Sequence, residues 1–161
     1  MNGVTDFSNL VGEWNGTNRV WLSPTDPVRE SPITAQVSMA AQGLFMTLRY
    51  AWADAGIPQD GLFVLGYQRD LEAATAVWID SWHMQDKFMT CLGTFGTQGN
   101  MILLGSYAAP PGPDWGWQID IAQQTDDALQ ITMHNISPEG EAMLAVETIL
   151  IRRPPSLSQE A

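Results

Sequence analysis

The sequence predicts an all-β fold: a closed up-and-down antiparallel barrel of about ten strands, with a short N-terminal helical turn before the first strand. Turn residues interrupt short β-rich runs about every ten residues. Hydrophobic and polar residues alternate in several runs, as between Leu44 and Trp52. No segment keeps a 3.6-residue period, so we expect little helix. An open meander of this length would leave two unpaired edges, and closure into a barrel removes them.

Each expected strand is bounded by glycine, proline or polar turn residues. Glycines such as Gly43 and Gly140 supply the positive φ that tight hairpins require. In chain order the expected strands are 12–22, 33–40, 44–53, 61–68, 74–83, 88–95, 101–108, 115–123, 129–136 and 141–152. The helical turn is expected at residues 6–11, with Asp6 as its cap. We expect one barrel domain over residues 1–153 and a disordered tail over residues 154–161.

Composition and charge narrow the classes of partner. The chain has 161 residues, 45% of them hydrophobic, which suits one globular domain. Its formal net charge of −11 disfavours nucleic acid and anionic membrane surfaces, and it favours solubility. Cys91 is the only cysteine, so no intrachain disulfide can form. Because neither a signal peptide nor a membrane-spanning apolar run is evident, we expect a cytoplasmic location.

Three strand segments are apolar on both faces: residues 62–65, 76–79 and 101–104. An antiparallel strand usually exposes one face to water, so these segments require additional burial. A homodimer interface or a covering loop would each provide it. We therefore expect a homodimer, with the covering loop as the alternative.

Tryptophans and charged residues within the strands are the candidate ligand-binding residues. Trp78 and Trp82 share a strand face with Asp80, and the chain contains seven tryptophans in all. Ala145 and Ile149 flank Glu147 on its own face, which predicts that Glu147 points inward, with Arg49 as its partner. The alternatives are that the tryptophans only fill the core and that Arg49 faces water. The predicted site comprises Arg49, Trp78, Asp80, Trp82, Trp117 and Glu147.

The sequence predicts neither a metal site nor a catalytic triad. Only His83 and His134 could supply imidazole ligands, and strand periodicity places Asp80 and His83 on opposite faces. Ser81 and His83 share a face, but residues two apart on a strand lie about 7 Å from each other, beyond hydrogen-bonding reach. Cys91 reads as a small buried hydrophobic residue.

Several segments resemble a known group of proteins. Gly12 and Trp14 resemble the G-x-W start of the calycin superfamily, which includes lipocalins, fatty-acid-binding proteins and nitrobindins. A bacterial family of uncharacterised domains in that superfamily is similar in four longer strings, WLSPTDP (21–27), WIDSWH (78–83), GSYAAPPGPDWGW (105–117) and HNISPEG (134–140). The resemblance implies a barrel and carries no established activity.

The resemblance also implies a structural contact. In calycins the motif tryptophan lies under a basic residue of the last strand. Here Trp14 begins the first expected strand, while Arg152 and Arg153 end the last, and those ends are neighbours in a closed barrel. The match to nitrobindins is partial because Asn18 stands where another glycine is expected. With only two histidines as possible axial ligands, we expect no haem and no other cofactor.

Three hypotheses about function follow from the sequence. A ten-strand barrel is wider than side chains alone fill, so the first is a binding module that holds a small apolar or amphipathic molecule in the lumen. The second is an enzyme of cyclase or isomerase type that uses a lumen carboxylate with a raised pKa, Asp80 or Glu147. The third is a non-catalytic, dimerising interaction domain.

Overall fold

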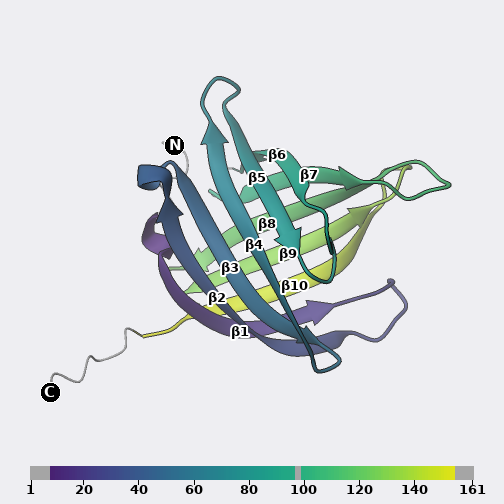
Figure 1. The fold of residues 1–161 in the computed structure, drawn as a ribbon, viewed down its shortest axis with the longest axis horizontal. Coiled ribbons are helices and arrows are strands. Elements are labelled where there is room, and N and C mark those ends of the chain that lie inside the picture. The colour runs from purple at the N-terminus through teal and green to yellow at the C-terminus, as the bar shows by residue number, and fades with distance from the viewer. Residues whose placement is uncertain (1–7, 97–98, 155–161) are drawn as a thin grey trace, which may run out of the picture.

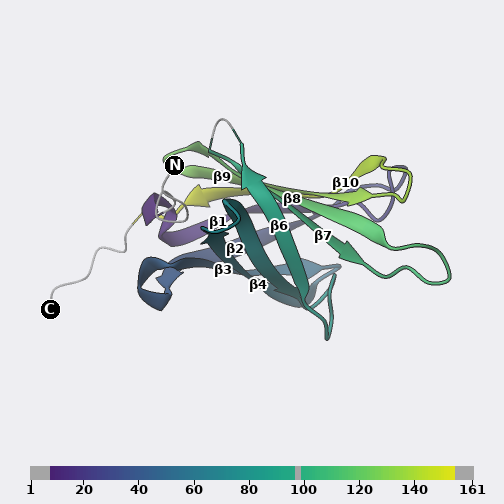
Figure 2. The same cartoon turned by 90° about the horizontal axis from the view of Figure 1, so that it is seen from above.

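Ten strands form one closed antiparallel barrel in the computed structural model, which describes residues 8–96 and 99–154. Each strand pairs with its neighbours in the chain, and β1 closes the sheet against β10 (Figure 1). β8–β10 lie on one side of the barrel and β2–β4 on the other (Figure 2). The predicted closed meander is therefore confirmed.

The strands follow the expected order with small shifts at their ends. They are β1 (Gly12–Val20), β2 (Arg29–Ala40), β3 (Phe45–Asp54), β4 (Ile57–Gln68), β5 (Ala73–Asp80), β6 (Met89–Phe95), β7 (Met101–Tyr107), β8 (Trp115–Thr125), β9 (Ala128–Ile136) and β10 (Ala142–Arg152). A 3₁₀ turn, η2 (Ala41–Gly43), joins β2 to β3, and residues 8–10 form another before β1. The proposed cap Asp6 and residues 155–161 of the expected tail lie outside the described residues.

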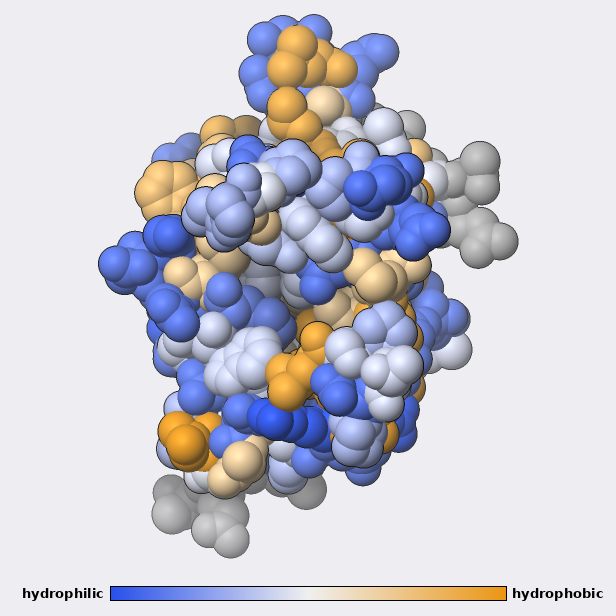
Figure 3. Space-filling view, turned by 90° about the vertical axis from the view of Figure 1, so that its right-hand side faces the viewer, coloured by the Kyte–Doolittle hydropathy of each residue, from blue (hydrophilic) through white to orange (hydrophobic). Residues whose placement is uncertain are grey.

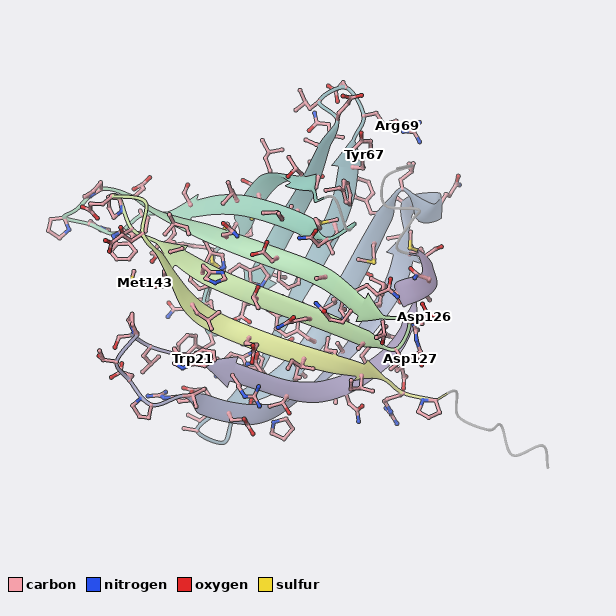
Figure 4. The ribbon with its side chains drawn as sticks, turned by 180° about the vertical axis from the view of Figure 1, so that it is seen from behind. Trp21, Tyr67, Arg69, Asp126, Asp127 and Met143 are labelled. Atoms are coloured by element: carbon pink, nitrogen blue, oxygen red, sulfur yellow. The ribbon has the colours of Figure 1, made fainter. Side chains whose placement is uncertain are left out.

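The connections divide between the two ends of the barrel. One end, the closed end, carries the turns 41–44, 69–72 and 126–127 together with the chain before β1. The other, the mouth, carries the longer connections 21–28, 81–88, 108–114 and 137–141. Figure 4 shows this separation, with Asp126 and Asp127 at the closed end and Trp21 and Met143 at the mouth. Ligand-binding residues of barrels are often held at such a mouth.

Trp14 fills the closed end. Its side chain is fully buried, its Nε1 donates a 2.9 Å hydrogen bond to the carbonyl oxygen of Leu10, and the Arg152 guanidinium lies 4.3 Å from the ring centroid. Gly16 permits the close approach of β1 to β10, because a Cβ there would lie 1.8 Å from the carbonyl oxygen of Ile149. The predicted packing of Trp14 under Arg152 is confirmed.

The strand segments predicted to be apolar on both faces have that character in the barrel. Their inward residues, such as Leu65 and Leu103, are buried in the core. Among their outward residues, Val77, Ile79 and Leu104 are exposed, whereas those of β4 are half-buried. Leu104 on β7 sits opposite Leu92 on β6, and 54% of each of these two residues is accessible. No loop covers this outer wall within residues 8–96 and 99–154.

Candidate functional site

A cleft of about 570 Å³ opens at the mouth, between the β5–β6 connection and the adjoining parts of β7 and β8. This mouth cleft lies within the 300–1,000 Å³ range typical of ligand pockets. Figure 3 looks onto the mouth end of the molecule, where small hydrophobic patches are set among hydrophilic side chains. The aromatic residues that line the mouth cleft are Trp78, Trp82, His83, Phe88, Tyr107 and Trp117.

The Asp80 carboxylate is the centre of a hydrogen-bond network beside the mouth cleft. Oδ1 accepts hydrogen bonds from the backbone N–H groups of Trp82 (2.8 Å) and His83 (2.7 Å), and lies 3.0 Å from Nδ1 of His83. Oδ2 accepts a 2.7 Å hydrogen bond from the Tyr50 hydroxyl, which itself accepts one of 2.8 Å from Nε1 of Trp78. Four donors therefore converge on a carboxylate that is 98% buried.

This network forms because β5 ends at Asp80. The chain turns sharply there, and the carbonyl oxygen of Asp80 accepts backbone hydrogen bonds from Met84 and Gln85 at 3.0 and 2.9 Å. An aspartate at the start of a turn commonly binds backbone N–H groups two or three residues further on. The turn therefore directs the imidazole of His83 back towards the carboxylate.

Gly61 makes room for the Tyr50 hydroxyl. It lies opposite both Tyr50 on β3 and Asp80 on β5. A Cβ at position 61 would stand 2.2 Å from the Tyr50 hydroxyl oxygen and 2.8 Å from the carbonyl oxygen of Ile79. The absence of a side chain on β4 thus allows β3 to reach Asp80 across the sheet.

The hydrogen bonds fix the protonation states of the buried groups. Burial alone raises the pKa of Asp80, but the hydrogen bonds and charge of His83 and the hydrogen bond from Tyr50 outweigh it, so this pKa lies below its ordinary value. Burial, followed by the negative charge of Asp80, raises the pKa of Tyr50 well above its ordinary value. Asp80 is therefore an ionised acceptor and Tyr50 a neutral donor.

Asp80 also fixes the orientation of the His83 ring. An ionised carboxylate only accepts hydrogen bonds, so Nδ1 of His83 carries a hydrogen, and in the neutral form of the ring Nε2 is the acceptor nitrogen. Nε2 makes no hydrogen bond within the described residues. The ring contacts Trp82 edge to face, with centroids 4.6 Å apart, and lies 5.5 Å from Trp78 and 5.8 Å from Trp117. His83 is thus a polar group held among aromatic rings.

Trp78 and Trp117 form the deep wall of the mouth cleft. Their rings are nearly parallel, at 14° with centroids 5.8 Å apart, and Phe63 stacks on the other side of Trp78 at 5.7 Å. Nε1 of Trp117 is buried and has no hydrogen-bond partner among the described residues. An unpaired buried N–H is energetically costly, so the cost of this donor is borne by the packing of the wall.

The interior beyond His83 is nearly filled. An enclosed cavity between the sheet walls has about 20 Å³ accessible to the centre of a water molecule, which is enough for about one water. Trp78 and His83 line both this cavity and the mouth cleft. The wide lumen expected for a ten-strand barrel is therefore absent from the described residues, because large side chains fill it. The space for a ligand lies at the mouth.

Four of the six residues predicted to bind a ligand are gathered at the mouth. Trp78, Trp82 and Trp117 line the cleft, and Asp80 is hydrogen-bonded to His83 of the cleft lining. Trp82 lies in the β5–β6 connection rather than on a strand, and its Nε1 donates a 3.0 Å hydrogen bond to Asp54. The structure therefore brings these four together.

Arg49 and Glu147 lie elsewhere, and their predicted pairing is wrong. Arg49 is exposed on the outer face of β3, beside a surface groove of about 340 Å³. Glu147 also points outward and forms a 2.9 Å ion pair with Arg19. A register shift in β10 between Leu144 and Val146 reverses the alternation expected from the sequence, so Val146 faces the core in place of Glu147.

The prediction that Asp80 and His83 occupy opposite faces is also wrong. It assumed that the strand continues to residue 83, whereas β5 ends at Asp80 and strand periodicity stops there. Ser81 makes no triad with them: its hydroxyl donates to Gln59 at 2.7 Å and accepts from the backbone of Asp60 at 3.0 Å. The lowered pKa of Asp80 also contradicts the raised pKa that the cyclase or isomerase hypothesis required.

Tyr50 and His83 are the members of the site that the sequence did not predict. Tyr50 was placed correctly on the inward face of its strand, but nothing local indicates that its hydroxyl meets Asp80. His83 had a local signal, because an aspartate followed three residues later by histidine fits a turn as well as a strand.

Neither a metal site nor a membrane-spanning helix is present in residues 8–96 and 99–154. No group of three or more histidine, cysteine, aspartate or glutamate side chains there could hold a metal ion. No helix in that part is long and apolar enough to cross a membrane.

The fold and site define a closed ten-strand β-barrel with an aromatic cleft at its mouth. Residues 5–152 match the model of a family described as a protein of unknown function, DUF1579. The match covers most of the chain, so the protein belongs to the DUF1579 family. No curated protein matches the chain.

Solved structures share the fold at low sequence identity. The chain is similar to Rv2717c from M. tuberculosis, with a TM-score of 0.65 and 16% identity over 94% of this chain and 97% of that one. It is also similar to an S-type phycobiliprotein lyase, CPES, from Guillardia theta, with a TM-score of 0.60 and 13% identity over 92% and 91% of the two chains. At these identities the likeness concerns the fold alone.

Proposed function

We propose that the protein is a binding module whose ligand is a small apolar or amphipathic molecule that enters the mouth cleft. The observation that carries this proposal is a cleft of about 570 Å³ walled by Trp78, Trp82 and Trp117. Aromatic walls supply apolar area for binding, at about 25 cal/mol per Å² buried. Nε2 of His83 is the polar group that orients the ligand.

A fluorescence titration tests this function. N-phenyl-1-naphthylamine, a neutral aromatic probe, gains emission when it enters an apolar site, so titration with the protein should give a saturable rise with a dissociation constant below about 1 mM. Trp82→Ala should weaken binding about tenfold because it removes one wall. Trp21→Phe, a tryptophan substitution outside the cleft lining, is the matched control and should bind as the wild type does. If the probe, oleate and 2-naphthol all fail to bind below millimolar concentration, the function is wrong.

We also propose the finer family assignment, that DUF1579 proteins of this kind are calycins. The G-x-W start at Gly12 and Trp14 supports this assignment. The position of Arg152, from the last strand, over the ring of Trp14 supports it as well. The stability of a Trp14 variant tests the structural role on which this assignment depends.

The exposed outer wall of β4–β7 supports a proposal of self-association. We propose that a second copy of this chain covers this wall. Leu92 and Leu104 are exposed on it, and its strand segments carry no charged residue although the protein as a whole is strongly acidic. The net negative charge of the protein disfavours contact between copies at its acidic surfaces. The uncharged segments are 62–66, 75–79, 90–94 and 102–106.

Sedimentation at micromolar concentration tests the homodimer. The wild type should sediment as a dimer, and Leu104→Lys should yield monomer. Gln118→Lys, on the neighbouring strand opposite Leu104, is the control for added charge and should have the smaller effect. A wild type that remains a monomer would contradict the proposal.

A further inference from the structure

The polar lining of the mouth cleft indicates which chemical class of ligand it accepts, given the proposed binding function. His83 lines the cleft, and the Asp80 network holds one of its two ring nitrogens. Nδ1 is held 3.0 Å from Oδ1 of Asp80, and the backbone N–H of His83 is bound to the same oxygen at 2.7 Å. Two contacts to one carboxylate oxygen hold both the backbone and the ring, so Nε2 is fixed in position as an acceptor.

Nε2 is accessible as well as unpaired. The buried polar atoms that lack a partner among the described residues are Ser31 Oγ, Trp117 Nε1 and His134 Nδ1, and Nε2 of His83 is not one of them. The ring itself keeps only 11% of its side-chain surface accessible. A ligand that reaches Nε2 therefore meets it among aromatic rings that exclude most water. Water then competes only weakly with the hydrogen bond between Nε2 and the ligand.

The charges around the mouth cleft disfavour an ionic ligand. An anion would place negative charge against an acceptor nitrogen, near the ionised Asp80 and within a protein of net charge −11. Lys87 is the one lysine or arginine of the lining, and Asp86 accompanies it. A cation gains little from Asp80, because all four donors already bind its two oxygens.

We propose that the mouth cleft selects neutral planar ligands that carry a hydrogen-bond donor, a phenolic hydroxyl or a ring N–H, and that His83 Nε2 accepts this hydrogen bond. The aromatic walls bind the ring system of the ligand, and His83 is the residue that determines specificity. Asp80 is a positioning residue that acts through His83.

Matched ligands test this inference separately from the proposed function. 2-Naphthol carries a hydroxyl donor, and 2-methoxynaphthalene has the same ring system without the donor. Both are titrated by displacement of N-phenyl-1-naphthylamine from the full chain. We expect 2-naphthol to bind about three- to tenfold more tightly, which corresponds to one hydrogen bond. The anion 2-naphthoate should bind more weakly than 2-naphthol.

Variants then assign the preference to His83. His83→Phe keeps an aromatic ring and removes the acceptor, so the affinity ratio of the two naphthalenes should fall to about one. His134→Phe replaces the other histidine, on the outer face of β9, and should leave the ratio unchanged. Nitrogen-15 NMR of the wild-type imidazole gives a second measure that needs no variant: 2-naphthol should shift the Nε2 resonance of His83, and 2-methoxynaphthalene should not.

The outcomes separate the two proposals. Equal affinities for 2-naphthol and 2-methoxynaphthalene in the wild type would overturn the specificity while leaving binding at the mouth in place. A preference for 2-naphthol that survives in His83→Phe would also overturn the role of His83. If neither compound binds, the proposed function fails together with the inference.

Discussion

The two ends of the barrel differ in the length of their connections and in what surrounds their tryptophans. At the closed end the connections are short, Trp14 is fully buried under Arg152, and Leu10 accepts its indole hydrogen bond. At the mouth most connections are longer, and the Asp80 network holds His83 beside an open aromatic cleft. Both ends use buried tryptophan, but the ring of Trp14 is covered by Arg152, whereas Trp78 and Trp117 line the mouth cleft. The difference separates residues that stabilise the barrel from residues that are available to a ligand.

The largest effect on stability is expected at the closed end. Trp14→Ala should lower the free energy of unfolding by about 3–5 kcal/mol, because it removes a large buried aromatic side chain and leaves a cavity. Urea unfolding measures the loss. Binding of N-phenyl-1-naphthylamine to the folded variant should remain. A loss below 1 kcal/mol would mean that the tryptophan is not a structural support, and the calycin assignment would lose its basis.

A smaller effect, dependent on pH, is expected from Asp80. Asp80→Asn should cost about 1.5–3 kcal/mol at neutral pH, the usual value for hydrogen bonds to a charged group. The pKa of Asp80 is lowered in the folded protein, so its contribution is fully present above its ordinary pKa of about 4 and is lost as pH falls through the folded value.

The difference in stability between the wild type and Asp80→Asn should therefore shrink below about pH 4. Urea unfolding at a series of pH values measures it. Asp86→Asn, an exposed aspartate of the same connection, is the control and should cost little at any pH. A constant difference across the acid range would contradict the proposed ionisation of Asp80.

Gly61→Ala should have an intermediate effect on the mouth. The added methyl group meets the Tyr50 hydroxyl and the backbone of Ile79, so we expect a loss of about 1–2 kcal/mol, as is usual for overpacking. Its distinguishing consequence is disruption of the hydrogen bond between Tyr50 and Asp80. Gly112→Ala, where the added methyl group meets only an ordinary contact at 3.5 Å, should be nearly neutral. Equal stability of the two variants would show that the strands adjust without loss.

The smallest stability effect is expected for Trp82→Ala. Its ring is partly exposed and its principal contacts are with His83 and Asp54, so the loss should be about 1 kcal/mol. Thermal unfolding measures this loss beside the weakened probe binding. A variant that unfolds as readily as Trp14→Ala would remove the distinction between the two ends.

The fold was predictable because its signals are local and repeated. Turn residues mark each hairpin, and alternation such as Leu48–Arg49–Tyr50 assigns the inward face of a strand directly. The closed end was predictable for the same reason, since a short motif at Trp14 and a basic residue in the last strand are enough to indicate their contact.

The mouth was only partly predictable, because its geometry depends on where alternation stops. The end of β5 at Asp80 changes the relation between Asp80 and His83, and the register shift in β10 reverses the face of Glu147. The hydrogen bond between Tyr50 on β3 and Asp80 on β5 crosses the intervening strand β4. It requires that Gly61, the residue of β4 between them, has no side chain. Tryptophan content alone indicated the wall of the site, whereas its polar centre depended on these interruptions.

Indole N–H resonances provide the most direct test of the claim that ligands bind at the mouth. The seven tryptophans give separate signals that single Trp→Phe variants can assign. On titration with 2-naphthol, the signals of Trp78, Trp82 and Trp117 should shift, and that of Trp14 should stay unchanged. A shift at Trp14 without any at those three would contradict the account.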